Sequence, residues 1–493
     1  MSRPSYKDFI AQREAILNEE STRYLGSDLV LNAKENEVNK ILMKNKSDEI
    51  SKGFKDPASF APAKHFFDAL DDIKASKVFQ ILKKMPKGGV LHCHDTALLS
   101  TDKIVEFTYR DNLWVCGDIF KTVPRFIFSK DKPPKVEGQN DWIKVSKERL
   151  QYGANDYDKA MRNLFTLYSD DAVEKYRDIN AMWSKFMELF AALDPIVGYV
   201  EVWKDYYYET LKEFYNDGVT YLEFRGLLPE LYDLDGNKYG PMQVTELYYE
   251  VLQKFKKDHP DFVGSKFIYA PLRFADATTF DKYLTTYSEL KANYPDFIAG
   301  FDVVGQEDKG FPLKGFAETF LKDGKDIPCV FHAGETNWNG LETDENLIDA
   351  ILLGTKRIGH GFAAVKHPKV LEELKKRDVC IEINPISNQV LKLVDDYRNH
   401  PAAILFSDNY PVVVSSDDPS FWEATPLSHD FYMAFMGIAS AHADLKFLKK
   451  LILNSFKYSS LNEAERDEGM KKWEKTWSKF LDIVLESEKT GSM

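Results

Sequence analysis

Cysteine is scarce in this chain: only four of its 493 residues are cysteine. They stand at positions 93, 116, 329 and 380 without any CxxC spacing, which excludes a scaffold built on disulfides. The count alone leaves the redox compartment open. Cys93 and Cys116 are equally compatible with a disulfide in a secreted protein and with two buried free thiols.

The chain also has no long hydrophobic run. No stretch approaches the ~18 consecutive apolar residues that span a bilayer, so we expect no membrane span. Residues 1–20 lack the apolar core of a secretory signal peptide, but Met1 can simply stand in place of a removed leader. An N-glycosylation pattern at Asn45 favours secretion only weakly, because such triplets often arise by chance.

The chain also lacks a surplus of basic residues. Lys and Arg number 65 against 78 Asp and Glu, which gives a formal net charge of -13. No basic surplus is available to displace counterions, so we expect no nucleic-acid partner. The apolar fraction of 44% and the charged fraction of 29% are those of an ordinary soluble globular protein, and they predict a large buried core.

Residues 1–82 are predicted to form a helical N-terminal arm. From Tyr6 to about Leu82 the segment is rich in Glu, Lys, Asn and Leu, and its apolar residues recur at helical spacing. Pro57 and Pro62 interrupt this pattern, so we expect a break between helices there.

From residue 83 to residue 493 the pattern changes to short β-branched or aromatic runs that alternate with amphipathic helical stretches. Each run ends in a polar residue or a glycine. Eight strand–helix units predict an α/β fold, a closed (β/α)8 barrel of the TIM type. The eight predicted strands are 89–94, 220–225, 266–273, 299–305, 329–335, 357–360, 379–384 and 412–418.

The segment that follows the first predicted strand is too long for a single crossover. Residues 105–166 carry Pro, Gly, aromatic and charged residues with little periodicity, and we expect a small inserted lobe there that covers the barrel mouth. Residues 445–485 return to helical spacing and are expected to pack outside the barrel.

Polar residues at the ends of the predicted strands form a coherent set. His92 and His94 lie two apart on one strand, so both imidazoles point to the same face. His332 ends the fifth run and Asp417 the eighth, and three imidazoles with one carboxylate suit zinc. Any one of these histidines taken alone is more simply a packed core residue, but their common place at strand ends favours a metal site.

The fourth run points to a single metal ion. Two-metal barrels of this chemistry usually place a bridging lysine near the end of strand four, where this chain has Asp302-Val303-Val304-Gly305. We therefore expect one Zn²⁺ per chain.

The motifs MPKGGVLHCHD, FHAGETNW, RIGHGF, INPISNQVL and VVVSSDDPSFW closely resemble the adenosine deaminase family, and the resemblance covers nearly the whole chain. The long arm and the insertion resemble the adenosine deaminase growth factor subgroup. That resemblance implies a secreted protein that forms a homodimer through its N-terminal arm, with residues 83–493 as the zinc deaminase barrel.

The resemblance also implies a role for each matched residue. It assigns zinc binding to His92, His94, His332 and Asp417, proton donation to Glu335, orientation of the attacking hydroxide to His360, and purine binding to Gly305 and Asp418. Asp418 would accept a hydrogen bond from a protonated purine N7, and Pro419 suggests the turn that this requires.

Contacts to the ribose are less determined by the sequence. Asp95 and Trp183 are candidates, and for Trp183 plain packing of an aromatic helix is an equal alternative. Gln306 stands where relatives often have histidine, and Leu272 where some have a polar residue, so the sugar side departs from the family pattern.

The chemistry of these residue types supports their assigned roles. Zinc lowers the pKa of water toward ~7, and the resulting hydroxide can attack a carbon at neutral pH. Glu335 would protonate purine N1 as the hydroxide adds to C6, which requires a raised carboxyl pKa. A surface carboxylate is the commonest fate of a glutamate, but Glu335 lies three residues past a predicted ligand at a strand end. His360 stands between two glycines, which allow close approach of a ligand, although a packed histidine is the alternative.

The sequence therefore predicts hydrolytic deamination of adenosine and 2'-deoxyadenosine to the corresponding inosines and ammonia. One alternative keeps the enzyme and changes the substrate to another 6-aminopurine. A second alternative is a growth-factor-like receptor-binding protein on a deaminase scaffold. Such an inactive descendant would be expected to have lost ligands, whereas all of the predicted ligands are present.

Overall fold

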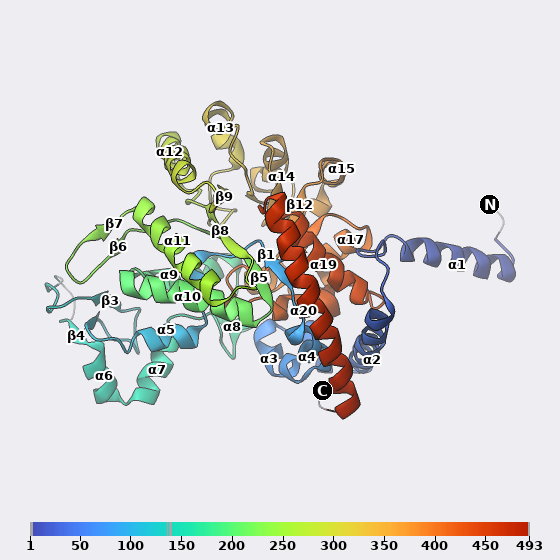
Figure 1. The fold of residues 1–493 in the computed structure, drawn as a ribbon, viewed down its shortest axis with the longest axis horizontal. Helices are drawn as coiled ribbons and strands as arrows, with labels where there is room; N and C mark the ends of the chain where they lie inside the picture. Colours follow the sequence, from blue (N-terminus) through green and yellow to red (C-terminus); the bar gives the residue numbers. More distant parts are fainter. Residues whose placement is uncertain (1–2, 136, 138–140, 492–493) are drawn as a thin grey trace.

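The computed structural model describes residues 3–135, 137 and 141–491, and its ribbon is drawn in Figure 1. Residues 1–2 of the predicted arm, residues 136 and 138–140 of the predicted lobe, and residues 492–493 at the end of the predicted barrel domain lie outside the described part.

Eight parallel strands form the centre of the fold in two four-stranded sheets. In sheet order they are β1 (Gly88–Val90), β5 (Val219–Gly226), β8 (Gly264–Tyr269) and β9 (Ile298–Phe301), then β10 (His332–Ala333), β11 (Arg357–His360), β12 (Cys380–Ile383) and β13 (Val412–Val414). Parallel bridges Phe301–Cys329 and Cys93–Asp417 join the two sheets at both edges. The strands thus close into the predicted (β/α)8 barrel.

One principal helix packs after each strand. In chain order these helices are α10 (Val200–Asn216), α11 (Pro241–Asp258), α12 (Ala277–Asn293), α13 (Ala317–Asp323), α14 (Glu342–Leu352), α15 (Pro368–Arg377), α17 (Ala402–Ser407) and α19 (Leu445–Lys457). Because helices cover the outside and side chains fill the inside, every residue of β5, β11 and β12 is buried.

Several strands are shorter than the sequence predicts, and the reason lies in the backbone. The predicted run 329–335 contains only the two-residue β10, because Gly334 turns the chain with a φ of 73°. The run 412–418 leaves the ladder after Val414, and Asp417 has a φ of 57°. These left-handed conformations turn the chain at the ends of the two strands, where the polar residues stand.

The N-terminal segment is helical, with the predicted break in the middle. It contains α1 (Tyr6–Ser21), α2 (Ala33–Lys55), α3 (Phe66–Ala75) and α4 (Lys77–Lys84), and 3-10 turns start at Pro57 and at Ala61. Glu35 of α2 is buried and accepts hydrogen bonds from Lys449 and from Trp477 of α20 (Glu463–Thr490). These contacts fix α2 against the C-terminal helices, which pack outside the barrel as predicted.

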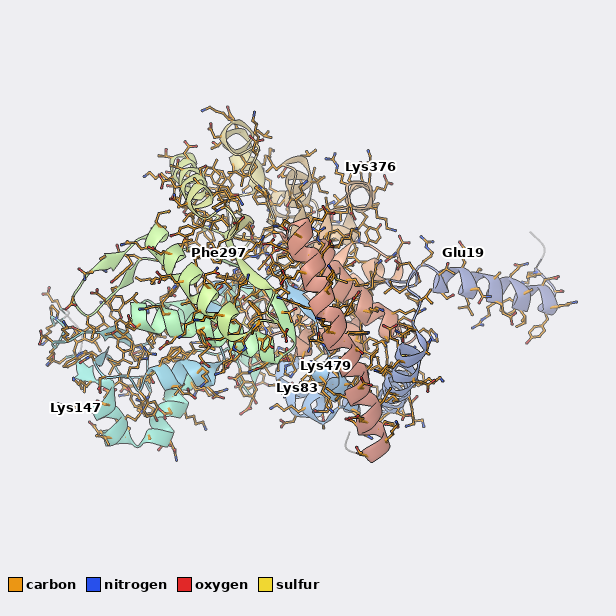
Figure 2. All side chains as sticks on the ribbon, viewed as in Figure 1. Glu19, Lys83, Lys147, Phe297, Lys376 and Lys479 are labelled. Carbon is orange, nitrogen blue, oxygen red and sulfur yellow. The ribbon has the colours of Figure 1, made fainter. Side chains whose placement is uncertain are left out.

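Helix α1 differs from the rest of the N-terminal segment. It extends away from the body of the molecule (Figure 1), and none of its residues is buried. Figure 2 shows its side chains, with Glu19 labelled, standing clear of the other elements.

The segment between β1 and β5 contains structure of its own. Antiparallel strands β2 (Leu113–Cys116), β3 (Arg125–Phe128) and β4 (Ile143–Lys144) form a small sheet, followed by α6 (Val145–Tyr152) and α7 (Ala154–Asn163). Helix α9 (Ile179–Val197) then leads back toward the barrel.

Burial bears on two questions that the sequence left open, the pairing of Cys93 with Cys116 and the glycosylation of Asn45. All four cysteines are buried, and Cys93 is a free thiol, so no disulfide joins Cys93 to Cys116. Asn45 lies inside α2 with its side-chain amide donating to the carbonyl of Ile41, so it is not an exposed glycosylation acceptor. Among the described helices, none combines the length and the apolar character that crossing a membrane requires.

Candidate active site

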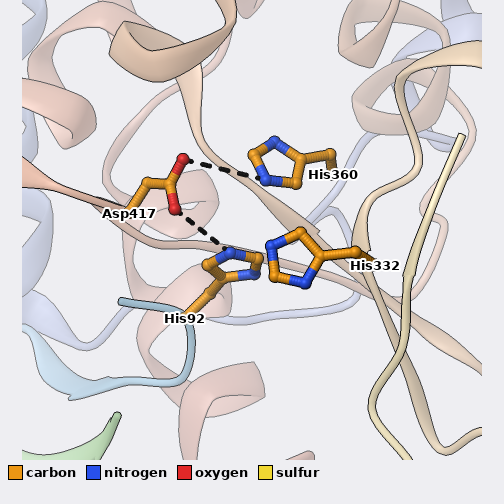
Figure 3. Close-up of side chains that lie close together, drawn as sticks. All are labelled: His92, His332, His360 and Asp417. Atoms are coloured by element: carbon orange, nitrogen blue, oxygen red, sulfur yellow. Dashed lines mark ion pairs between the residues drawn. The ribbon is translucent and has the colours of Figure 1, made fainter. Parts of the chain in front are cut away.

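Four polar side chains meet at the carboxyl ends of the strands (Figure 3). They are His92, His332, His360 and Asp417, all buried, and one ligand atom from each lies within 4.8 Å of the others. His94 belongs to an overlapping group with Asp417 and Asp418. The structure therefore brings three predicted ligands together, His92, His332 and Asp417, and places His360 among them. The fourth, His94, lies against Asp417, with Nε2 3.0 Å from Oδ1.

The backbone holds this cluster in an unusual conformation. His360 and Asp417 both adopt left-handed backbone angles, with φ of 63° and 57°. Such conformations cost free energy in non-glycine residues and persist where the surroundings impose them. Two backbone hydrogen bonds hold Asp417 in place: its N–H donates to the carbonyl of His92, and its carbonyl accepts from the N–H of His94.

Gly359 makes room for the first imidazole. A Cβ atom at this position would lie 2.8 Å from Cε1 of His92, closer than any real contact of that kind. The glycine before His360 is therefore required for the His92 ring to reach the centre of the cluster.

Carboxylates behind the cluster fix two of the imidazoles. Nδ1 of His92 lies 2.7 Å from Oε2 of Glu382, and Nδ1 of His332 lies 2.6 Å from Oδ2 of Asp302. A carboxylate accepts the Nδ1 proton, so each ring presents the lone pair of Nε2 to the cluster. This is the arrangement in which histidine binds a metal ion.

These carboxylates belong to a buried ionic network inside the barrel. Arg225 lies 2.7 Å from Asp302 and 2.8 Å from Glu382, and Arg357 lies 2.5 Å from Glu382 and 2.6 Å from Glu223. Burial raises the pKa of Glu382, but the two arginines outweigh this effect and hold its pKa well below the usual range. The network keeps the carboxylates charged and in place.

The donor set fits a metal ion. Nε2 of His92 and Oδ1 of Asp417 are buried and have no hydrogen-bond partner among the described residues. Burial raises the pKa of Asp417, yet the neighbouring histidines lower it well below the usual range. Nitrogen and carboxylate donors in such a cluster are those that zinc prefers.

Glu335 lies beside this cluster. Its backbone N–H and that of Gly334 both donate to the carboxylate of Glu307, which fixes the turn after β10. Its Oε1 lies 3.6 Å from Nε2 of His360. Burial, followed by the charges of Asp417 and Glu307, raises the pKa of Glu335 well above its ordinary value. Glu335 is thus a candidate neutral acid at neutral pH.

Asp418 faces the same cavity. The chain turns after Asp417, so both adjacent aspartates line the cavity rather than opposite faces of a strand. Burial and the charge of Asp417 raise the pKa of Asp418 well above its ordinary value. The surroundings thus push the pKa values of these two adjacent carboxyl groups in opposite directions.

The cavity has an aromatic wall and a polar end. Trp183, Phe186, Met187 and Phe190 of α9 form this wall, and Asp95 and Asp194 add carboxyl groups to the lining. Gly226 is needed here, because a Cβ atom on it would lie 1.8 Å from Oδ2 of Asp95. Trp183 also packs edge-on against Phe186, which confirms its packing within the helix, whereas its contact with the ribose stays a prediction.

The loop after β9 places Gly305, the residue predicted to bind the purine, at the cavity. Gly305 lines the cavity with a φ of 108°, and a Cβ atom there would lie 2.8 Å from the ring of Phe274. Next to it, Gln306 donates to the side chain of Asn180 at the start of α9. Leu272 lines the cavity as well.

Sequence reasoning missed the residues behind the cluster. Five residues contact the site residues directly or through one further hydrogen bond, and the sequence pattern predicted a supporting role for none of them. They are Asp302, Glu382, Glu307, Asn388 and His400. The signal for two of them was present, because Asp302 and Glu382 are carboxylates at or next to the carboxyl ends of predicted strands. The others act from loops and a short helix, where no periodicity marks them.

Comparison with known proteins identifies the family. The adenosine deaminase family model matches residues 157–475, and the adenosine/AMP deaminase N-terminal model matches residues 1–82. The chain is 53% identical to an adenosine deaminase of Aedes albopictus over 96% of this chain and 88% of the relative. It is 41% identical to adenosine deaminase 2 of Pongo abelii over 96% of this chain and 93% of the relative.

A solved structure agrees on the fold. A Burkhoderia amidohydrolase with bound Zn matches with a TM-score of 0.58 at 16% identity and covers 83% of this chain and 94% of the other. Taken together with the site geometry, these similarities show that the chain belongs to the adenosine deaminase family and, within it, to the adenosine deaminase growth factor subgroup.

Proposed function

We propose that this protein is a zinc-dependent hydrolase that converts adenosine and 2'-deoxyadenosine to inosine and 2'-deoxyinosine with release of ammonia. The observation that carries the proposal is the buried cluster of imidazoles and Asp417 beside Glu335, whose pKa is raised well above its ordinary value. The relatives named adenosine deaminase support adenosine as the substrate.

We assign the metal to His92, His94, His332 and Asp417, one zinc ion per chain. A zinc ion held there would lower the pKa of water toward ~7 and so supply hydroxide at neutral pH. Asp302 and Glu382 support this assignment, because they orient His332 and His92 with Nε2 toward the cluster. The Burkhoderia amidohydrolase was solved with bound Zn, and that observation concerns the amidohydrolase alone.

Glu335 supplies the proton that the aromatic ring needs. As the water-derived oxygen bonds to C6, protonated Glu335 delivers its proton to N1, so no charge builds up on the ring. The C6–N6 bond then breaks, the amino group takes the proton of the C6 hydroxyl and leaves as ammonia, and C6 becomes a carbonyl carbon. The other proton of the water returns Glu335 to its acid form. One water is consumed for each ammonia released.

The other cavity residues hold the purine and the sugar. Asp418, with its raised pKa, donates its proton in a hydrogen bond to N7, which needs no protonated purine. Gly305 leaves space for the purine edge, and Asp95 and Trp183 contact the ribose. Here the structure favours a donor where the sequence led us to expect an acceptor.

Two alternatives share parts of this site. Another 6-aminopurine substrate would use the same cluster and Glu335 and would differ only along the α9 wall. A receptor-binding protein would not need the raised pKa of Glu335 or the oriented imidazoles, so these features favour the enzyme.

We also propose that the protein is secreted and forms a homodimer through its arm. Helix α1 has no buried residue and exposes Tyr6, Phe9, Ile16 and Leu17. Apolar side chains on an unpacked helix are typical of an interface with a second copy.

The test is direct. Zinc-loaded protein is mixed with adenosine, 2'-deoxyadenosine, adenine, adenosine 5'-monophosphate and a methylthio-nucleoside, and the change in ultraviolet absorbance is followed for each. The proposal expects turnover of the first two compounds above the others. Zinc-loaded, folded protein that deaminates none of them would refute it.

A further inference from the structure

A chain of buried hydrogen bonds runs from the first turn of α17 to the imidazole of His360. The backbone N–H of Ala402 lies 3.0 Å from Nδ1 of His400. Nε2 of His400 lies 2.9 Å from Oδ1 of Asn388. Nδ2 of Asn388 lies 3.1 Å from Nδ1 of His360. Asn388 and His400 are 1% and 3% exposed, so water does not compete for these contacts.

The direction of every bond in this chain follows from its first member. A backbone N–H can only donate, and Ala402 stands in the first turn of α17, where N–H groups have no partner inside the helix. Nδ1 of His400 must therefore accept, which leaves the single ring proton on Nε2. Burial supports this neutral ring, because it lowers the pKa of His400 to about 3.

The opposite orientation of the Asn388 amide is excluded. It would place the NH₂ group against Nε2 of His400, so that His400 would accept at both nitrogens, which a neutral imidazole cannot do. Oδ1 of Asn388 therefore accepts from His400, and its NH₂ group donates to Nδ1 of His360. Because Nδ1 of His360 accepts, the proton of that ring is on Nε2.

This proton points into the site. Nε2 of His360 lies 3.7 Å from Oδ2 of Asp417 and 3.6 Å from Oε1 of Glu335, and Figure 3 marks the first of these contacts. A ring nitrogen that carries a proton cannot bind a metal ion. The chain thus separates His360 from His92 and His332, whose Nδ1 atoms face carboxylates and whose Nε2 atoms carry lone pairs.

We propose that Asn388 and His400 are positioning residues that lock His360 as the Nε2–H tautomer, so that His360 donates a hydrogen bond to the attacking oxygen and does not compete for the metal. Neither residue is among those that line the cavity. The use that is made of the His360 proton rests on the proposed deaminase function, whereas the tautomer itself does not.

The decisive variant is Asn388→Asp. A carboxylate has the same shape but only accepts, so it would draw the His360 proton to Nδ1 and turn a lone pair toward the cluster. We expect kcat for adenosine to fall about 10- to 100-fold with KM little changed. Nitrogen-15 NMR of the histidine rings in the zinc-loaded protein should show His360 as Nε2–H in the wild type and as Nδ1–H in N388D.

Two variants of His400 separate positioning from packing. His400→Leu fills the space but removes the donor, and it should reduce kcat to a similar extent. His400→Gln retains an N–H for Oδ1 of Asn388 and should recover most of the lost activity. His429→Gln is the matched control. His429 is also buried and accepts a backbone N–H at Nδ1, from Thr425, but its Nε2 has no hydrogen-bond partner in the described part of the chain, and the ring does not line the cavity.

The outcomes distinguish this inference from the proposed function. A wild-type His360 that carries its proton on Nδ1 would overturn the inference whatever the activity. A tautomer change in N388D without loss of kcat would overturn the positioning role. A wild type with the expected tautomer but no deamination of any purine would refute the function and leave the tautomer assignment standing.

Discussion

Nε2 of His360 lies 3.6 Å from Oε1 of Glu335, so the ring proposed to orient the attacking oxygen and the proposed acid meet at one edge of the cavity. The two groups come from neighbouring strands, β11 and the end of β10, whose register pairs Ala333 with His360. The barrel geometry thus brings an imidazole and a carboxyl group together beside the residues assigned as metal ligands.

Removing the acid should abolish turnover without loss of metal. Glu335→Gln keeps the shape of the side chain but cannot transfer a proton to N1, so kcat should fall about 10²- to 10⁴-fold. The zinc content should be unchanged, because Glu335 is not among the assigned ligands. The exposed Glu342→Gln on α14 is the control. Wild-type kcat in E335Q would remove Glu335 from the mechanism.

Weakening the support of His332 should weaken metal binding. Asp302→Asn removes the carboxylate that accepts the Nδ1 proton of His332, which should lower metal affinity about 10- to 100-fold. Competition with a chelator, followed by metal analysis, measures this change. Unaltered metal affinity in D302N would mean that the carboxylate of Asp302 is not needed to orient His332.

Breaking the buried network should cost stability. Arg225→Met leaves Asp302 and Glu382 short of their shared cation, and removal of one partner of a buried ion pair costs about 3–5 kcal/mol. Urea unfolding of the metal-free protein gives the free energy of unfolding. Arg398→Met, which breaks a pair half exposed on the surface, should change it by less than about 1 kcal/mol. Equal losses in the two variants would contradict this account.

Small changes near Asp95 should act on substrate binding. Gly226→Ala places a Cβ atom where Oδ2 of Asp95 lies, so Asp95 should move and KM for adenosine should rise about tenfold, or ~1.4 kcal/mol. Gly315→Ala, where a Cβ atom meets nothing, is the control. If Asp95 carries the effect, the double variant G226A/D95N should be no worse than either single variant.

Stability should fall in mild acid because of buried neutral histidines. Burial lowers the pKa of both His400 and His429 to about 3. Between the unfolded value of ~6.5 and that folded value, the unfolded chain binds more protons, so stability declines as the pH falls through this window. At one unit below ~6.5 each histidine costs about 1.4 kcal/mol.

Comparison of variants isolates this effect. Melting temperatures of the wild type and H429Q between neutral and mildly acidic pH should show a shallower decline in H429Q. Parallel curves would show that His429 does not contribute to the pH dependence.

The sequence predicts those features of the fold and the site that leave a local pattern of residues. The eight strands and their order were predictable, because each parallel strand is an apolar run covered by a helix. Strand lengths were not, because the left-handed turns at Gly334 and Asp417 depend on the packed site. The predicted residues of the site do converge, since the carboxyl ends of parallel strands meet at one mouth of a barrel.

What the sequence did not reveal was the hydrogen bonding behind the site. The pairing of Arg225 with Asp302 and Glu382 joins residues far apart in the chain, and no local pattern marks it. The same holds for Asn388 and His400, whose roles follow only from the order of donors and acceptors in space. The burial of Asn45 likewise depends on the packing of α2 against other elements.

The most direct test of the account is one titration of metal-free protein with zinc, in which bound metal and adenosine turnover are measured on the same samples. The account predicts that deamination rises in proportion to zinc and reaches its maximum at one zinc per chain. It also predicts that Asp417→Ala, which removes the assigned ligand carboxylate, abolishes both zinc binding and deamination. Full turnover without bound metal, or one tightly bound zinc with no turnover of adenosine, would contradict it.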